Sequence, residues 1–425
     1  MSFQGSAATI LALVALFTPA TFSAQVAAQE AVQLTRQEAR ALAMESGPRF
    51  LAARAKGSAA RGAARTDRVY PFNPRAEIKG AEAVDPGGWG DYEAVISQEI
   101  EWAGQWLVRR NAGSRAMEAA RQDERDALRN LFLDLDLAFY GLVAAEERFR
   151  VSQEGAELAG NLREAVQTQL REGQVSALEM NLASIEAGRA EARALAARNN
   201  LKRAQQALRD ILGLEATSPV MTREAAAELP AFETSDLSAV VEAAMARRPD
   251  VQAARAREEE ARSRRRLAGM ALIPNVELGA VAKRGAAGSD PTYGLRIAFP
   301  IPLWNWNQGQ REEFRALEDL AQVERLDAEL RVQGEVLTAL EAYRTATEEL
   351  ELFTESVLLP AQENRDLLQA AFRAGRFDLP TTLLLQSQLV DSELAYWDSW
   401  IRQREAQAAA EAAIGDIPEL EGDEG

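Results

Sequence analysis

The sequence has 425 residues, of which 47% are hydrophobic, so it is long enough to bury a large core. Its 48 Lys and Arg against 65 Asp and Glu residues give a net charge of −17, which opposes binding to nucleic acid or to an anionic membrane surface. It contains no His and no Cys, which excludes disulfides, thiolate or imidazole catalysis and the usual zinc ligands. We therefore expect no enzyme, no catalytic or metal site and no cofactor.

The first 29 residues carry no charged side chain, and residues 7–17 form an apolar run. This run has the length of a secretory h-region and is too short to span a bilayer. Small residues at 26–28 suit cleavage. The sequence thus predicts a signal peptide at 1–28, and the lack of Cys predicts a mature N-terminus without a lipid anchor.

The rest of the chain contains two copies of one unit. PRFLAARA at 48–55 aligns with PDVQAARA at 249–256, and REGQVSALE at 171–179 aligns with RAGRFDLPT at 373–381. These spacings, 201 and 202, predict a tandem duplication of units that do not bury their surface alone. The predicted divisions are a first repeat at 29–213, a linker at 214–236, a second repeat at 237–415 and an acidic tail at 416–425.

Each repeat is expected to open with a short helix, continue through a β-hairpin and enter a very long helix. In the first copy Thr35 and Glu38 have capping-box spacing. The hairpins are expected at about 74–102 and about 274–304, and the long helices at about 105–172 and about 308–372. Helices of that length favour long antiparallel coiled-coil packing over a compact fold.

A glycine-centred turn follows each long helix, at Gly173 and at Gly375. Ser176, with Glu179 three residues later, forms a second capping box, and Asp378 stands in the equivalent place of the second copy. Both turns are therefore predicted to be helix–turn–helix tips with a fresh N-cap. The helices that follow are expected to end near Gly213 and Gly415.

The second hairpin alternates apolar and other residues over 293–304. A half-buried strand of a soluble sheet would alternate too. Three features favour a membrane strand: an apolar run of about ten residues, charge on the opposite face, and nearby tryptophans. The predicted lipid-facing residues are Tyr293, Leu295, Ile297, Phe299, Ile301 and Leu303.

Five of the seven tryptophans lie in or beside the hairpins, as an aromatic belt at a membrane interface would require. The predicted belt consists of Trp102, Trp106, Trp304 and Trp306, with Trp89 nearby. Asn307 and Gln310 have the spacing of an N-cap pair that starts the second long helix. Two hairpins supply only four strands, and open edges do not survive in lipid, so the chain is expected to oligomerise.

In these features the sequence resembles the TolC family of outer membrane efflux proteins of Gram-negative bacteria. The resemblance covers essentially the whole mature chain, through the duplication, the opening LTRQEARALAMESGPRFLAARA, the two tips and LRDILGL at the end of the first copy. The segment IPLWNWNQG and the chain length are most similar to the CzcC-type branch, which works with heavy-metal RND pumps.

The resemblance implies a mainly α fold with a small β part. It implies a homotrimer whose strands form a twelve-stranded outer-membrane barrel, above an α-barrel that extends through the periplasm. A periplasmic adaptor and, indirectly, an inner-membrane RND-type pump would be its partners. The chain would conduct substrate passively, with heavy-metal cations or other small solutes as the expected cargo.

The resemblance also implies that the helical tips meet the adaptor. The implied tip residues are Arg171, Gly173, Gln174, Ser176, Arg373, Gly375, Arg376 and Asp378. Glu179 is the implied aperture residue, although its capping role accounts for it equally well.

Two alternatives remain open at this stage. The Ala/Glu/Arg-rich helices alone are typical of a periplasmic coiled-coil scaffold without channel activity. The second alternative lies within the TolC family: the chain would be the outer membrane duct of a drug-efflux or type I protein secretion system.

Overall fold

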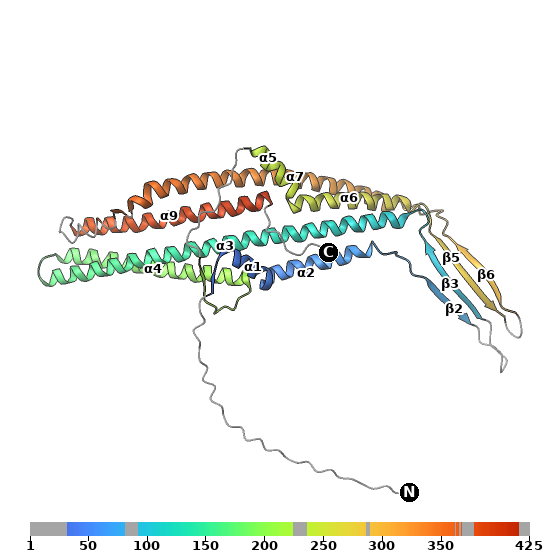
Figure 1. The fold of residues 1–425 in the computed structure, drawn as a ribbon, viewed down its shortest axis with the longest axis horizontal. Helices are drawn as coiled ribbons and strands as arrows, with labels where there is room; N and C mark the ends of the chain where they lie inside the picture. Colours follow the sequence, from blue (N-terminus) through green and yellow to red (C-terminus); the bar gives the residue numbers. More distant parts are fainter. Residues whose placement is uncertain are drawn as a thin grey trace, which may run out of the picture.

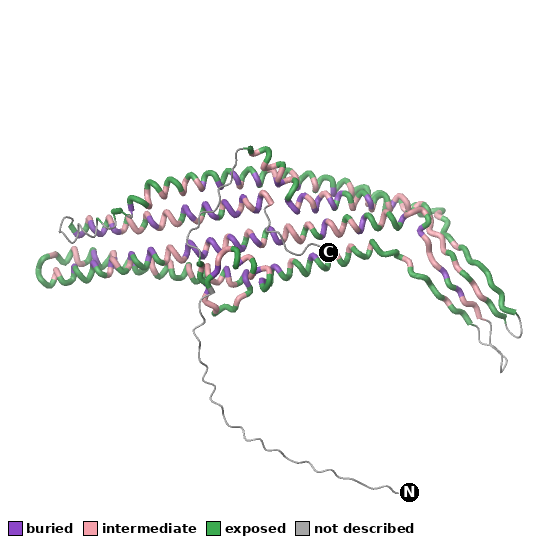
Figure 2. The backbone as a smooth tube through the Cα atoms, viewed as in Figure 1, coloured by how far each residue is buried: buried purple, intermediate pink, exposed green. Residues whose placement is uncertain are grey.

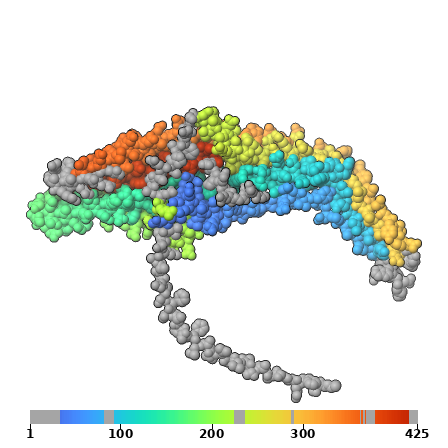
Figure 3. Space-filling model, viewed as in Figure 1, coloured from blue at the N-terminus to red at the C-terminus, as the bar shows by residue number. Residues whose placement is uncertain are grey.

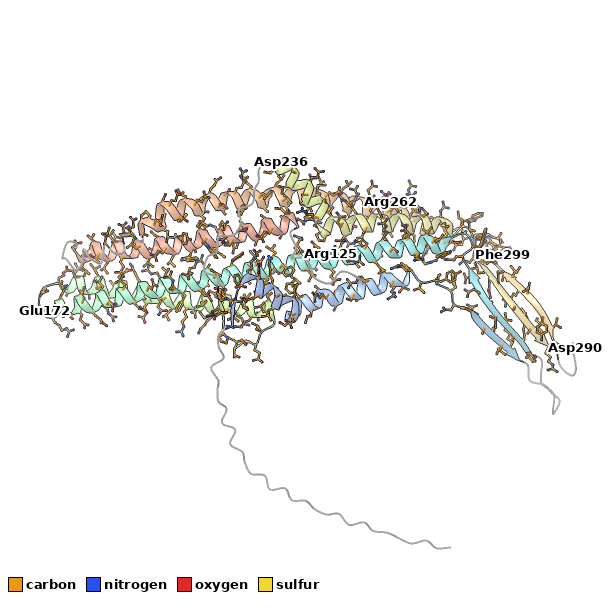
Figure 4. All side chains as sticks on the ribbon, in the orientation of Figure 1. Arg125, Glu172, Asp236, Arg262, Asp290 and Phe299 are labelled. Atoms are coloured by element: carbon orange, nitrogen blue, oxygen red, sulfur yellow. The ribbon has the colours of Figure 1, made fainter. Side chains whose placement is uncertain are left out.

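The computed structural model describes residues 32–80, 92–223, 236–285, 290–361, 363–364, 367 and 378–415. The molecule is elongated, with a body of long helices and a four-stranded sheet at one end (Figures 1 and 3). Glu172 and Asp290 lie at opposite ends of the molecule (Figure 4). The signal peptide predicted at 1–28, Trp89 and the acidic tail at 416–425 lie outside the described residues.

The two halves of the chain present the same order of elements. The first half contains β1 (Val32–Leu34), α1 (Arg36–Ser46), α2 (Pro48–Thr66), β2 (Arg75–Gly80), β3 (Tyr92–Ile100), α3 (Gln105–Arg171) and α4 (Ala177–Leu212). The second half contains β4 (Val220–Thr222), α5 (Leu237–Arg247), α6 (Pro249–Met270), β5 (Val276–Arg284), β6 (Thr292–Ala298), α7 (Gln308–Phe353), the π-helical turn η1 (Thr354–Leu358) and α9 (Leu379–Ile414).

The long helix predicted at about 105–172 is confirmed by α3, which has 67 residues. At a rise of about 1.5 Å per residue, such a helix is about 100 Å long. Its counterpart α7 has 46 residues and passes into η1, after which residues 359–361, 363–364 and 367 are again α-helical. The helix was expected to continue to about 372, and residues 368–377 are not described.

The helices lie side by side in a single wall (Figure 1). Near the sheet, neighbours pack in the order α2, α3, α6 and α7, and toward the other end the order is α4, α3, α9 and α7. Helices α3 and α7 therefore extend along both the sheet end and the opposite end of the wall. α2 and α4 occupy the same position in the wall at the two ends, as do α6 and α9. One side of the wall is formed by α2 and α4, and the other by α7.

Gly213 allows α4 to end against the junction between α1 and α2. Its φ of +72° is left-handed, and a Cβ there would lie 2.7 Å from the carbonyl oxygen of Ser46 and 2.8 Å from Cδ of Pro48. Gly415 ends α9 in the same way, at φ +83° and against Arg248. The ends predicted near Gly213 and Gly415 are confirmed, and only glycine combines this backbone with this closeness.

The four strands form one antiparallel sheet in the order β2-β3-β5-β6. The pairs β2–β3 and β5–β6 are the expected hairpins, and β3 pairs with β5 from Tyr92↔Arg284 to Ile100↔Val276. The sequence did not indicate this pairing, which joins the two repeats at the sheet. The strands β2 and β6 are the two outer edges.

The strand expected over 293–304 is shorter than predicted, because β6 ends at Ala298. Pro300 and Pro302 have no backbone N–H to donate to a neighbouring strand. The alternating apolar pattern of the sequence therefore continues beyond the last residue that is hydrogen-bonded in the sheet. The expected N-cap bond of Asn307 is also wrong. Asn307 has a left-handed φ of 60° and no side-chain cap bond, whereas a capping side chain normally needs an extended backbone.

A buried ion cluster joins α1 to the middle of α3 and to the end of α9. The carboxylate of Asp136, a residue 2% exposed, accepts from Arg36 Nη2 at 2.8 Å and from Arg40 Nε at 3.0 Å. Glu411 also binds Arg36, whose guanidinium lies over the ring of Tyr140 at 5.6 Å. Burial raises the pKa of Tyr140 to about 12. The cluster thus connects the two repeats inside the main core.

Gly213→Ala is expected to destabilise the protein, because alanine pays about 1–2 kcal/mol for the left-handed backbone and its Cβ also meets Ser46. Gly188→Ala is the matched control, since a Cβ at this α4 residue has no atom within 4 Å and alanine favours a helix. The measurement is loss of helical circular dichroism on heating. Equal melting temperatures for the two variants would contradict the claim that α4 needs a glycine where it ends against the junction of α1 and α2.

Asp136→Asn should lower the free energy of unfolding by about 3–5 kcal/mol, because it leaves two partly buried arginines without their shared, buried carboxylate. Asp134→Asn is the control: its side chain is 54% exposed and lies 3.8 Å from Arg49. Such a surface pair contributes at most about 1 kcal/mol. Denaturant unfolding followed by circular dichroism compares the two, and similar midpoints would show that the cluster does not hold the repeats together.

Candidate functional site

The sheet has two faces of opposite character. Its register places apolar side chains of all four strands on one face, with Gln98 as the polar exception among the central rows. The members of this apolar face are Ala76, Ile78, Ala94, Ile96, Leu278, Ala280, Ala282, Tyr293, Leu295 and Ile297. The largest of them are solvent-exposed in the single chain, including Leu295 at 88% and Ile78 at 80% (Figure 2).

The other face carries charge of both signs. Its charged members are Arg75, Glu77, Lys79, Glu93, Glu99, Glu277, Lys283 and Arg296. Lys283 Nζ lies 3.1 Å from Glu93 Oε2 on the neighbouring strand, and Asn275 Nδ2 donates to Glu99 Oε1 at 2.8 Å. A sheet with one apolar and one charged face fits a wall that separates hydrocarbon from water.

Phe299, Ile301 and Leu303 lie beyond the last residue of β6, at 57%, 69% and 61% exposure. They continue the apolar surface of the sheet into the segment that leads to α7. Phe299 marks this corner between sheet and helices (Figure 4). The structure therefore brings the six predicted lipid-facing residues to one end of the molecule, three within the strand and three after it.

Four exposed tryptophans surround the same corner. Trp102 and Trp106 flank the start of α3, and Trp304 and Trp306 precede α7. Trp102 Nε1 donates to the carbonyl oxygen of Pro274 at 2.9 Å, which links the end of the first hairpin to the start of the second. Their indole rings thus lie where the apolar sheet meets the polar helices.

The opposite end of the molecule is the tip between α3 and α4. Gly173 makes the turn with a φ of +75°. Ser176 N donates to Glu179 Oε2 at 2.7 Å and Glu179 N donates to Ser176 Oγ at 3.3 Å, so the predicted capping box is confirmed. These hydrogen bonds hold the pKa of Glu179 below its usual value.

The second tip begins α9 in the same way. Thr381 N donates to Asp378 Oδ1 at 3.1 Å, which confirms Asp378 as an N-cap and lowers the pKa of its carboxyl. Gln174, on the first tip, contacts Glu172 at 3.0 Å. Arg171 is exposed and donates from Nε to the carbonyl oxygen of Gln167 at 3.4 Å. Arg373, Gly375 and Arg376 lie outside the described residues.

The ion cluster of Arg36, Arg40 and Asp136 was missed at the sequence level. A signal was present, because Asp136 interrupts the apolar run LFLDLDLAFYGLV, and Arg36 and Arg40 share one face of their helix. Among the described residues, His, Cys, Asp and Glu nowhere gather in groups of three or more that are able to hold a metal ion. None of the described helices has both the length and the apolar character needed to cross a membrane.

Comparisons with known proteins identify the fold and a family domain in the second half of the chain. Residues 240–416 match the family model described as outer membrane efflux protein. The chain is 24% identical over 306 residues to the cobalt-zinc-cadmium resistance protein CzcC of Cupriavidus metallidurans, covering 71% of this chain and 72% of that protein. It is 25% identical over 345 residues to the pyoverdine export outer membrane protein OpmQ of Pseudomonas putida, covering 76% and 70%.

Among solved structures, the CmeC outer membrane channel of Campylobacter jejuni is similar with a TM-score of 0.74. The identity is 16%, and the alignment covers 89% of this chain and 85% of CmeC. The similarity to CzcC is consistent with the branch that IPLWNWNQG indicates. Residues 240–416 therefore carry an outer membrane efflux protein domain, and most of the chain has the fold of a solved outer membrane channel.

Proposed function

We propose that this chain forms a homotrimer in which three sheets close into one twelve-stranded barrel. The proposal rests on one observation: the four-stranded sheet has two open edges, one apolar face and one charged face. Two copies would give eight strands, and barrels of about eight strands have interiors filled by side chains or one small ligand. Three copies are the smallest ring that leaves room for a channel.

Below the barrel, the helical walls of the three copies continue as an α-barrel through the periplasm. The proposed unit is a first repeat at 29–213, a linker at 214–236 and a second repeat at 237–415, after a signal peptide at 1–28. The apolar face, with Tyr293, Leu295, Ile297, Phe299, Ile301 and Leu303, contacts lipid. Trp102, Trp106, Trp304 and Trp306 lie at the periplasmic membrane interface, where indole is favoured.

The two helical tips are proposed to meet a periplasmic adaptor that connects to an inner-membrane RND-type pump. Support comes from their position at the end opposite the sheet and from the exposed Arg171 and Gln174. Arg373 and Arg376 are proposed for the same role in the second tip. Glu179, in the first turn of α4 at the first tip, is the proposed aperture residue.

The proposed substrates are heavy-metal cations or other small solutes, conducted passively to the exterior. The similarity to CzcC, which is named for cobalt, zinc and cadmium resistance, supports the metals. The similarity to OpmQ, which is named for pyoverdine export, supports a small organic molecule as the second candidate.

Ile297→Asp is expected to abolish most trimer in the outer membrane while helical circular dichroism is retained, because a carboxylate on the lipid face is costly. Ile297 is 65% exposed at the middle of the apolar face. The measurement is the trimer yield in isolated outer membranes.

Thr292→Asp is the matched control, since Thr292 lies on the charged face of the same strand, opposite Lys283. It is expected to assemble normally. Normal trimer yield from Ile297→Asp would contradict the lipid-facing assignment, as would recovery of the unmodified protein in the soluble periplasm.

A deletion strain is expected to become more sensitive to cobalt, zinc or cadmium, with resistance restored by the unmodified gene. The measurement is the growth-inhibiting concentration of each ion. Unchanged metal sensitivity together with loss of secretion of a small organic metal chelator would favour the second candidate.

A further inference from the structure

Helices α2, α3 and α6 are strongly basic at the ends where they meet the sheet (Figure 1). The last eight residues of α2, the first eleven of α3 and the last ten of α6 contain nine arginines and no Asp or Glu. These arginines are Arg61, Arg65, Arg109, Arg110, Arg115, Arg262, Arg264, Arg265 and Arg266. At the opposite end of the molecule, residues 150–195 contain five basic and seven acidic residues. The sheet end of the wall is therefore basic in a chain whose net charge is −17.

The charged face of the sheet continues onto one side of α3. Glu101 follows Glu99 at the next alternate position along the chain, and it accepts from Arg109 Nη2 at 2.5 Å. Arg109 therefore marks the charged side of α3. Leu107 precedes Arg109 by two residues, which is about 200° around a helix, so it lies on the opposite side. Arg110 is three residues after Leu107 and shares that side with it.

One ion pair connects the charged side of α3 with α2 and α6. Arg264 of α6 donates from Nη2 to Oδ2 of Asp67, which follows the last residue of α2, at 3.0 Å. Asp67 lies against Gly113 of α3, where an added Cβ would lie 2.8 Å from the Cβ of Asp67. Gly113 is four residues from Arg109 and so shares its side of α3. The pair of Arg264 and Asp67 is therefore on the charged side of the wall.

The opposite side of the wall carries an exposed arginine on each of the three helices. Arg65 and Arg266 each lie two residues from a member of the ion pair between Asp67 and Arg264, so they are on the opposite side. Both are exposed, as is Arg110. In the part of the chain that the structure describes, none of the three forms an ion pair. These three residues, the outer arginines, thus share the side of the wall that continues the apolar face of the sheet.

The outer arginines all lie close to the sheet. Arg65 is one residue from the end of α2, Arg110 five from the start of α3 and Arg266 four from the end of α6. At about 1.5 Å per residue, all three are within about 8 Å of the helix ends. In each case an exposed aliphatic residue lies nearer the sheet, namely Val69 at 61%, Leu107 at 54% and Ile273 at 38%. With distance from the sheet, this surface therefore changes from apolar to basic.

Helix stability alone does not account for the outer arginines. Arg65 and Arg266 are near helix C-termini, where the helix dipole favours a cation, but Arg110 is near the N-terminus of α3, where the dipole disfavours one. A guanidinium matches a phosphate in shape and charge and binds it through two parallel hydrogen bonds. An arginine beside apolar residues reaches such a phosphate by laying its carbon stem along them. The arrangement therefore fits a phosphate that lies beside hydrocarbon, as in a phospholipid.

We propose that the outer arginines bind the phosphate groups of anionic phospholipids in the membrane leaflet that faces the helices. This inference rests on the proposed function, which places the apolar face of the sheet in the outer membrane. The exposed aliphatic residues contact acyl chains there, and the arginines reach the headgroups. The net charge of −17 opposes adsorption of the chain as a whole, so this local basic surface directs the contact with lipid.

Quenching of tryptophan fluorescence tests this inference, because four exposed tryptophans lie at the same corner between sheet and helices. The protein is reconstituted in vesicles that mix phosphatidylcholine with phosphatidylglycerol, with each lipid brominated in turn. The quenching by each lipid gives their relative binding constants. At low salt, the unmodified protein is expected to prefer phosphatidylglycerol about fivefold, the size expected for one arginine near an anionic lipid. High salt should reduce this preference.

The variant that carries Arg65→Gln, Arg110→Gln and Arg266→Gln should lose the preference. The corresponding triple lysine variant should keep most of it, because lysine retains the charge. A matched control with the same change in net charge should keep the full preference. It changes three exposed arginines of α3 and α4 away from the sheet: Arg163→Gln, Arg189→Gln and Arg198→Gln. Helical circular dichroism checks that each variant is folded.

A folded glutamine variant that keeps the preference, or equal binding of both lipids by the unmodified protein, would overturn the inference. So would loss of the preference when inorganic phosphate is added at constant ionic strength, because the site would then bind free phosphate in place of lipid. Absence of quenching by either lipid would show that the sheet does not enter the membrane, and it would overturn the proposed function itself.

Discussion

Backbone hydrogen bonding within a bilayer is the constraint on which this architecture depends. Hydrocarbon offers no partner for an unpaired N–H or carbonyl, so a membrane sheet has no tolerance for open edges. The four strands of this chain leave two edges open, on β2 and β6. The pairing of β3 with β5 removes the two inner edges that separate hairpins would have had, and it leaves the outer edges of β2 and β6 without a partner strand among the described residues.

The same arrangement extends into the helices, because the order of helices near the sheet repeats the order of the strands. A helix inside a bundle needs one broad apolar face, whereas a helix in a single wall needs two narrow stripes on opposite sides. α3 has both neighbours within the chain. Among the described residues, α2 and α7 pack against other helices on one side only, and the other side of α7 carries a row of exposed leucines.

Much of the fold was predictable where the signal is local. The capping boxes of Thr35 and Ser176, the glycine stops and the hairpins depend on residues a few positions apart, and the structure contains them. Three features were not predictable in this way. The β3–β5 register depends on pairing across about 180 residues, the early end of β6 on hydrogen bonds that proline removes, and the left-handed Asn307 on the path of the chain into α7.

In the candidate site, too, local features were predictable from the sequence and long-range contacts were not. The alternation of Tyr293, Leu295 and Ile297 was visible in one strand, but the apolar face of the whole sheet required the register. The two arginines that bind Asp136 come from a helix about 100 residues away, and Glu411, which also binds Arg36, lies 275 residues from Asp136. No spacing rule connects these residues.

The short parallel pair of β1 and β4 bears on the order of assembly. Val32 pairs with Val220, and Thr222 N donates to Glu146 at 3.1 Å, so the beginning of the first repeat is bound to the segment that follows it. Every group in this contact lies at or before residue 223. All residues that pair β1 with β4 are therefore synthesised before the second repeat. The two ends of the first repeat are able to pair during translation, before the second repeat has been made.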